Sequence, residues 1–338
     1  MQSTAHQFKL WALHNRLRLW CLWLLGTLVT GFANAATPLM SEWVDIRIEA
    51  GQILIPSMID GQQGESIINM GSRRSFVNSA FLSAHTPALD YGRDITVAGV
   101  HKNAQQPFVR LLPIDLFGKT MVLQFPLVAE LGSSDIQMLL GGGFLQRLIF
   151  QFDFPNQRMR LMPRNSLNLR KAGNVVTKRD SPSGLPMVRV RLNDEANLWL
   201  TLNTGMTSGM LVRKRTARRH GWLEKFPTKT TVSQGIHSTA DMLTFNLPTM
   251  EIGPYTLESP IVSVTQGKKE LAVFQQESIL GPELRTASPL TERFGVSVKN
   301  FGNQSDGFLG YDVLKHFVLT VDYKTAAVHL SQPEPGFL

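Results

Sequence analysis

Apolar and polar residues alternate over short stretches along most of the chain, with turn-forming residues between the stretches. Examples are residues 43–48 (WVDIRI), 187–192 (MVRVRL) and 294–298 (FGVSV). A period of two places the apolar side chains on one face of a strand. The pattern therefore predicts an all-β body. Short helices are expected at only four places, 76–84, 143–149, 211–222 and 312–317.

One longer pattern occurs twice in the same order. An apolar strand runs into Asn-X-Gly at Asn69-Met70-Gly71 and again at Asn203-Thr204-Gly205. Much later in the chain, each motif is followed by two apolar residues and a glycine, Leu139-Leu140-Gly141 and Phe308-Leu309-Gly310. Twelve residues after each of these glycines an aspartate lies on a further apolar stretch. The ordered set indicates an internal duplication.

The duplicated set resembles the bacterial, signal-peptide-bearing members of the retropepsin-like and pepsin-like aspartic proteases. The resemblance covers roughly 43–163 and 186–332. In that family a strand delivers Asp-Thr/Ser-Gly to the active site, and the later apolar-apolar-Gly segment crosses behind it in a ψ-shaped loop. The resemblance implies two β-barrel lobes with a cleft between them. Its expected boundaries are an N-terminal lobe at 41–164, a linker at 165–184 and a C-terminal lobe at 185–334.

Both positions that match the family's catalytic aspartates hold an amide, Asn69 and Asn203. Met70 also replaces the small hydroxyl residue of the first motif, whereas Thr204 keeps it in the second. The proteases use two carboxylates that share one proton, and an amide cannot accept that proton near neutral pH. Each positioned acid–base group raises the reaction rate by about 10²–10⁴-fold, so hydrolysis by this mechanism is expected to be lost. No catalytic residue is expected, and Asp60-Gly61 is interpreted as a hairpin turn.

The family carries a flap hairpin between each catalytic motif and its later glycine. The candidates here are Gly99-Val100-His101 and Gly235-Ile236-His237. The two histidines would face the cleft, bind a metal together or sense pH, or they are simply exposed hairpin residues. Two histidines without carboxylate or thiol partners make a thin ligand set. No metal and no other cofactor is therefore expected.

Residues 1–35 are expected to be a signal peptide. Three cations, Lys9, Arg16 and Arg18, precede or open a mostly apolar stretch, and Ala33-Asn34-Ala35 supplies the small-x-small pattern for cleavage. The apolar stretch is short against the ~20 residues that span a bilayer, although an uncleaved anchor is the alternative. The only cysteine, Cys21, lies inside this segment. These features predict a periplasmic or secreted protein with no transmembrane segment after cleavage.

The chain is basic, with a formal net charge of +8. Part of the excess gathers just after the second motif, at Arg213, Lys214, Arg218 and Arg219 among others. Helical spacing would place several of these cations on one face. That face is either simply solvated or contacts an anionic partner, such as membrane headgroups or an acidic protein. Nucleic acid is not expected, because no nucleic-acid motif or aromatic interleaving accompanies the cations.

Residues 267–306 lengthen the second half and form a loop, a lid or a partner surface. Three functions follow from the whole pattern. The first is a pseudo-aspartic protease that binds an extended peptide or unfolded protein segment as an added strand. The second is a working endopeptidase with another base, such as His101, His237 or a carboxylate of the insertion. The third is a structural envelope scaffold whose site is filled by Met70 or Met206.

Overall fold

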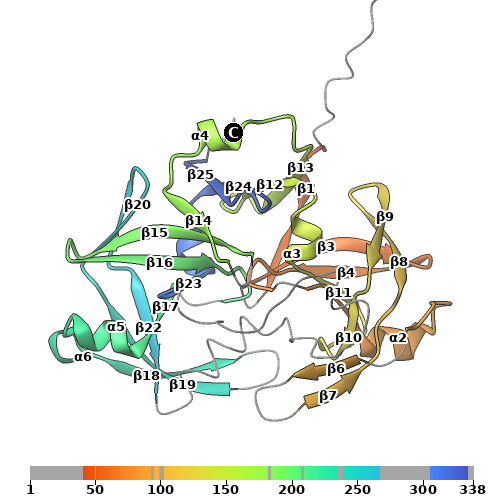
Figure 1. The fold of residues 1–338 in the computed structure, drawn as a ribbon, viewed down its shortest axis with the longest axis horizontal. Helices are drawn as coiled ribbons and strands as arrows, with labels where there is room; N and C mark the ends of the chain where they lie inside the picture. The colour runs from red at the N-terminus through yellow and green to blue at the C-terminus, as the bar shows by residue number, and fades with distance from the viewer. Residues whose placement is uncertain are drawn as a thin grey trace, which may run out of the picture. The chain divides into compact units, whose positions relative to one another are not determined.

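The computed structural model describes residues 41–49, 51–72, 74–92, 95–98, 103–181, 184–206, 209–234, 239–266 and 305–333. Strands make up most of their regular structure, which confirms the predicted all-β body (Figure 1). The described residues all belong to one compact unit. Several expected features lie outside the described residues. They are the signal peptide, both flap candidates, the strand expected at 294–298 and all of the 267–306 insertion except its last two residues.

The first half of the chain folds around an eight-stranded sheet. Its order is β10-β5-β11-β4-β3-β8-β9, with β2 added beside β3. The strands are β2 (Arg47–Glu49), β3 (Gln52–Ile59), β4 (Gln62–Ile68), β5 (Phe76–Asn78), β8 (Leu111–Leu116), β9 (Lys119–Gln124), β10 (Leu127–Ala129) and β11 (Ile136–Leu140). Two pairs are parallel, β11 with β4 and β10 with β5. A separate hairpin consists of β6 (Ile95–Ala98) and β7 (Asn103–Gln106).

The second half repeats this order within a ten-stranded sheet. Its path is β18-β19-β22-β17-β23-β16-β15-β20-β21, with β14 added beside β15. The strands are β14 (Thr177–Arg179), β15 (Pro186–Leu192), β16 (Ala196–Leu202), β17 (Met210–Val212), β18 (Lys229–Gln234), β19 (Thr239–Asn246), β20 (Thr249–Ile252), β21 (Tyr255–Glu258), β22 (Ile261–Thr265) and β23 (Gly307–Leu309). The run from β22 to β21 matches the run from β10 to β9 strand for strand. The parallel pairs, β23 with β16 and β22 with β17, also match. The duplication seen in the sequence is therefore present in the topology.

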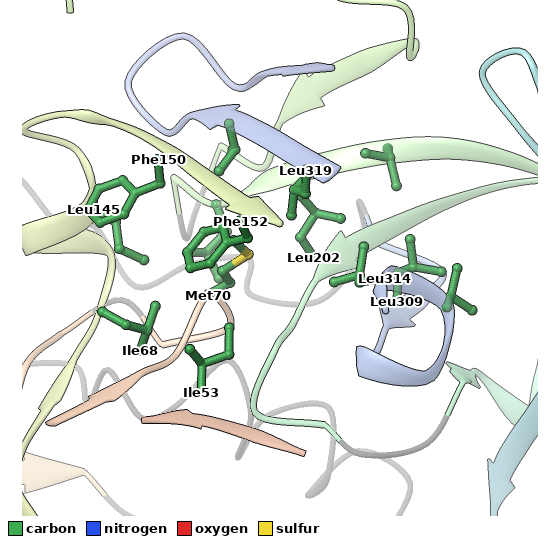
Figure 2. Close-up of a cluster of buried hydrophobic side chains, with 14 of the residues drawn as sticks. Ile53, Ile68, Met70, Leu145, Phe150, Phe152, Leu202, Leu309, Leu314 and Leu319 are labelled. Carbon is green, nitrogen blue, oxygen red and sulfur yellow. The ribbon is translucent and has the colours of Figure 1, made fainter. Parts of the chain in front are cut away.

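A third sheet takes strands from both halves. Its order is β1-β13-β12-β24-β25, with β1 (Val44–Asp45), β12 (Ile149–Asp153), β13 (Arg158–Met162), β24 (Val318–Asp322) and β25 (Ala327–Ser331). β12 and β24 pair antiparallel at its centre, and the Gln151 side chain donates to the Thr320 hydroxyl at 2.9 Å. The main hydrophobic core also takes side chains from both halves, including Ile68, Phe152 and Leu319 (Figure 2).

The helices within the described residues are short. They are α2 (Ser79–His85), α3 (Gly142–Leu145), α4 (Leu169–Ala172), α5 (Lys214–Arg219), α6 (Trp222–Lys225) and α9 (Tyr311–Leu314). α2, α3, α5 and α9 overlap expected helical stretches, although their bounds differ from expectation. α6 shares only Trp222 with the stretch expected at 211–222, and α4 was not expected. The stretch expected at 76–84 begins as strand β5, and its helix starts only after Asn78, whose side chain caps it. The stretch expected at 211–222 is divided, because Gly221 adopts φ 65° between α5 and α6.

The segment expected as a linker, 165–184, holds regular structure. It contains α4, and it contains β14, which pairs antiparallel with β15 from Thr177↔Val188 to Arg179↔Pro186. Its polar, Lys/Arg-rich composition predicts only that it connects the two halves. The pairing of β14 depends on a partner strand further along the chain, which composition does not reveal.

Candidate functional site

The two Asn-X-Gly motifs leave their strands in the same way. Asn69 follows β4 directly and Asn203 follows β16 directly. The Asn69 backbone N–H donates to the Leu140 carbonyl at 3.0 Å, and the Asn203 N–H donates to the Leu309 carbonyl at 2.9 Å. The acceptors lie at the ends of β11 and β23, the strands that run parallel to β4 and β16. Each motif is thus held by the apolar-apolar-Gly segment of its own half.

Each asparagine side chain also holds its own loop. Asn69 Oδ1 accepts from the Gly71 N–H, and Asn203 Oδ1 accepts from the Gly205 N–H, both at 2.9 Å. Both side chains are buried, with 6% of Asn69 and 3% of Asn203 exposed. With the amide oxygen engaged in this way, the Nδ2 group of each side chain is a hydrogen-bond donor.

The two loops lie against each other, although 134 residues separate them along the chain. A Cβ added at Gly71 would stand 2.4 Å from the Cγ of Asn203, and one added at Gly205 would stand 2.5 Å from the Nδ2 of Asn69. No Cβ fits at either distance. Both glycines are therefore required by the close approach of the other loop's asparagine, and the fold brings Asn69 and Asn203 together.

Thr204 ties the two loops by two hydrogen bonds. Its hydroxyl accepts from the Met70 N–H and donates to the Ile68 carbonyl, each at 3.1 Å. The matching bonds in the other direction cannot form, because Met70 has no hydroxyl. Its fully buried side chain instead belongs to the main core cluster with Ile68 and Phe152 (Figure 2). The contact between the loops is therefore asymmetric.

Tyr323 supports the Met70 side of the site from the second half. Its hydroxyl donates to the Met70 carbonyl at 3.0 Å. The phenol is fully buried, and burial raises its pKa well above the ordinary value. Sequence reasoning missed this residue. The available signal is that Tyr323 follows Asp322, whereas the first half has Phe154 after Asp153, so only the second half supplies a hydroxyl there.

Gly141 and Gly310 pack against backbone segments that follow the two motifs. A Cβ at Gly141 would stand 2.1 Å from the Arg74 carbonyl oxygen. The Gly142 N–H donates to the Ser72 carbonyl at 2.7 Å. In the second half the Gly310 N–H donates to the Gly209 carbonyl at 2.8 Å. Close backbone packing thus accounts for the first glycine and a backbone hydrogen bond positions the second.

The two repeated aspartates hold turns. Asp153 accepts from the Asn156 side chain at 2.9 Å and from Arg158 Nε at 2.8 Å. Asp322 accepts from Arg164 at 3.0 Å and from the Thr325 hydroxyl at 2.8 Å. Both carboxylates are nearly inaccessible and are engaged by these partners. Both aspartates therefore stabilise the turns that follow β12 and β24.

Asp60-Gly61 forms the expected tight turn between β3 and β4. Both residues adopt positive φ, 51° and 74°. Positive φ at both central residues of a two-residue loop matches the right-handed twist of the flanking strands. The turn sets the register of the hairpin that delivers Asn69.

The predicted basic cluster divides between surface and interior. Arg213 was expected on the basic helix face, but it is buried, and its Nε donates to the Ser305 carbonyl at 2.9 Å. It precedes α5 and lies at the end of β17, which explains why helical spacing misplaced it. Lys214 is half-buried, and Arg218 and Arg219 are exposed. Arg213 is therefore removed from the candidate surface.

Two further findings concern the described residues alone. No three His, Cys, Asp or Glu side chains within them gather closely enough to hold a metal ion. None of their helices has the length and apolar character needed to cross a bilayer. The flap histidines His101 and His237 lie outside this part of the chain.

The comparisons with known proteins assign no family. No protein-family model matches this chain, and no curated protein matches it. The repeated topology and the contacts between the Asn69 and Asn203 loops are the features that bear on function.

Proposed function

We propose that this chain is a pseudo-aspartic protease of two retropepsin-like lobes, periplasmic or secreted, that binds an extended peptide segment without hydrolysing it. The observation that carries the proposal is the contact between the two Asn-X-Gly loops, in which each glycine lies against the other loop's asparagine. The repeated strand order supports two related lobes. The paired loops support a composite site to which each lobe contributes one asparagine.

The chemistry of the pair favours binding over catalysis. A carboxylate pair shares a proton and can act as acid and base, whereas two amides stay neutral and do neither near neutral pH. Thr204, Tyr323 and backbone groups hold the loops in place. These neutral groups do not serve as a general base at that pH.

The same chemistry suggests what the pair recognises. Each Oδ1 accepts from its own loop's glycine, and each amide nitrogen is a hydrogen-bond donor by its chemistry. A peptide carbonyl oxygen is the matching acceptor. Since only 6% and 3% of the two side chains are exposed, a single oxygen atom can approach them more readily than a side chain. An added strand would supply such an oxygen from its main chain.

The first test compares the native chain from Ala36 with an Asn69→Asp/Asn203→Asp variant. Both are incubated with a denatured protein mixture at several acidic and neutral pH values, and fragments are identified by mass spectrometry. The native chain is expected to leave the mixture intact and to retain extended peptides. Fragments produced by the pure native chain would overturn the proposal in favour of a hydrolase with another base.

Two further variants test the role of the amide. Asn203→Leu removes the donor at similar size and is expected to lose peptide retention. Thr256→Ala, an exposed change on β21, is the matched control and is expected to retain peptides. Equal retention by native chain and Asn203→Leu would show that the amide pair does not bind the ligand.

A structural scaffold is the second candidate. The low exposure of Asn69 and Asn203 favours it, because an occluded pair would bind nothing. Met206, which is buried in a cluster with Leu211, Met242 and Phe308, lies next in the chain after the second motif. The scaffold interpretation gains support if neither the native chain nor the double aspartate variant retains any peptide.

A further inference from the structure

Helix α5 exposes a concentrated positive charge, here named the α5 basic face. It consists of Lys214, Arg215, Arg218 and Arg219, of which Lys214 is half-buried and the three arginines are exposed. The two remaining residues of the helix, Thr216 and Ala217, are buried. Burial of these two residues places the four cations on the other side of α5, a helix that neighbours α6 (Figure 1).

This arrangement opposes the stability of the helix. Lys214 with Arg218, and Arg215 with Arg219, are like charges four residues apart, a spacing that destabilises a helix. The first turn carries two of the cations and no acidic residue, although the amino end of a helix favours negative charge. The like-charge pairs and the two cations of the first turn are therefore unfavourable for the helix, whereas Arg218 and Arg219 lie in its last turn, where the helix dipole favours cations.

Acidic residues nearby do not neutralise the exposed arginines. Within the described part of the chain, no ion pair includes Arg215, Arg218 or Arg219. The carboxylate of Glu195 instead forms an ion pair with Lys225 of α6, with 3.5 Å between Lys225 Nζ and Glu195 Oε1. An external anion would relieve the repulsion within α5.

The character of the face distinguishes a lipid surface from a protein partner. None of the large hydrophobic residues that are exposed in the described chain lies between 213 and 226. Leu223 and Phe226 pack against the core instead. A specific protein interface usually has a buried apolar or aromatic anchor at its centre. A layer of phosphate headgroups needs only charge, which is what α5 offers.

We propose that the α5 basic face docks this protein on an anionic phospholipid surface. The proposal does not depend on the peptide-binding function, because the site at Asn69 and Asn203 involves none of these cations. A Lys or Arg near an anionic membrane changes the binding constant by about fivefold, from about 1 kcal/mol per cation. Neutralising two of them is expected to weaken binding on the order of 25-fold.

The experiment is co-sedimentation of the full chain from Ala36 with lipid vesicles. Binding is expected to vesicles that contain phosphatidylglycerol, to fall as salt is raised and to be absent with phosphatidylcholine alone. The variant Arg218→Gln/Arg219→Gln is expected to bind these vesicles about 25-fold more weakly than the native chain. The matched control is Arg170→Gln/Lys171→Gln, which removes the same charge from the exposed face of α4 and is expected to bind almost as the native chain does.

Several outcomes would overturn the proposal. One is equal loss of binding in the α5 and α4 variants, which would indicate a response to net charge alone. Another is vesicle binding that persists in the α5 variant while its circular dichroism and thermal midpoint match the native chain. A third is binding to soluble polyglutamate without binding to phosphatidylglycerol vesicles, which would identify an acidic protein as the partner. Full displacement from vesicles by millimolar inorganic phosphate at constant ionic strength would indicate a free-phosphate site instead.

Discussion

Asn69 and Asn203 keep the same hydrogen bond within their loops, from the glycine two residues later. An amide and a carboxylate are nearly the same size, so a loop of this shape accepts either group. What differs is charge: two carboxylates this close would repel each other unless they shared a proton, and two amides need none. At the residue scale the pair is therefore compatible with stable packing and with recognition of an acceptor oxygen, and it lacks an acid–base group.

The buried phenol of Tyr323 predicts a pH dependence of stability. Burial disfavours its charged form, so its pKa in the folded state lies above the unfolded value of about 10. The stability that Tyr323 contributes is then fully present at neutral pH and is lost as pH rises through and above that value. Tyr323→Phe is expected to cost about 1–2 kcal/mol near pH 7, because the Met70 carbonyl loses its donor.

Denaturant unfolding of the native chain and Tyr323→Phe between pH 7 and about 11 measures this effect. The difference between the two free energies of unfolding should shrink or reverse above about pH 10. Tyr91→Phe is the control at a phenol that is 44% exposed, and its curve should follow the native chain. A difference for Tyr323→Phe that is independent of pH would contradict the argument.

At the scale of elements, single polar side chains decide where strands end and helices begin. Asn78 is the last residue of β5 and is fully buried. Its Oδ1 accepts from the N–H groups of Ala80 and Leu131, while its Nδ2 donates to the carbonyls of Ser133 and Ile136. One side chain thus caps α2 and holds the segment that leads into β11.

Asn78→Ala is expected to cost about 3 kcal/mol of folding stability. About 1 kcal/mol comes from the lost helix cap, and the rest comes from buried groups left unpaired. The matched control is Asn168→Ala, since Asn168 caps α4 with one bond to the Lys171 N–H at an exposed position. That change should cost about 0.5–1 kcal/mol. Equal losses in the two variants, measured by denaturant unfolding, would show that the inner contacts of Asn78 contribute nothing.

At the scale of the whole molecule, the two halves share a sheet and a core, and their Asn69 and Asn203 loops meet. β12 pairs with β24 over five residues, from Ile149↔Asp322 to Asp153↔Val318. Tyr323 reaches Met70, and Thr204 reaches Ile68. Each contact joins residues that are more than a hundred positions apart. The two halves are therefore expected to unfold as one cooperative unit.

Leu319→Ala tests this cooperativity. Leu319 is fully buried on β24 opposite Phe152, so its truncation should cost about 2–5 kcal/mol. Native-state hydrogen exchange is expected to show equal loss of protection in β4 of the first half and β16 of the second. Val232→Ala, at a residue that is 67% exposed, should leave the hydrogen-exchange protection of both strands unchanged. Protection that falls in β16 and stays high in β4 would mean that the halves unfold separately.

Local signals in the sequence predicted much of the fold and the candidate site. Alternation predicted strands, Asp60-Gly61 predicted its turn, and the ordered glycines predicted the duplication. These features depend on neighbouring residues, and a local pattern records them. The start of α2 was misplaced because Phe76 and Val77 fit a helix as well as a strand by pattern alone. These two residues form a strand because β5 pairs in parallel with β10, a segment about fifty residues further along the chain.

The sequence by itself determined the strand-rich class, the order of the repeated motifs and the amide chemistry at positions 69 and 203. Tertiary structure alone decided that β14 pairs within the expected linker, that Arg213 is buried against Ser305 and that Tyr323 supports Met70. The physical reason is the range of the contacts. Strand alternation and turn chemistry act between near neighbours, whereas pairing, burial and the meeting of the two asparagines depend on segments that only the folded chain brings together.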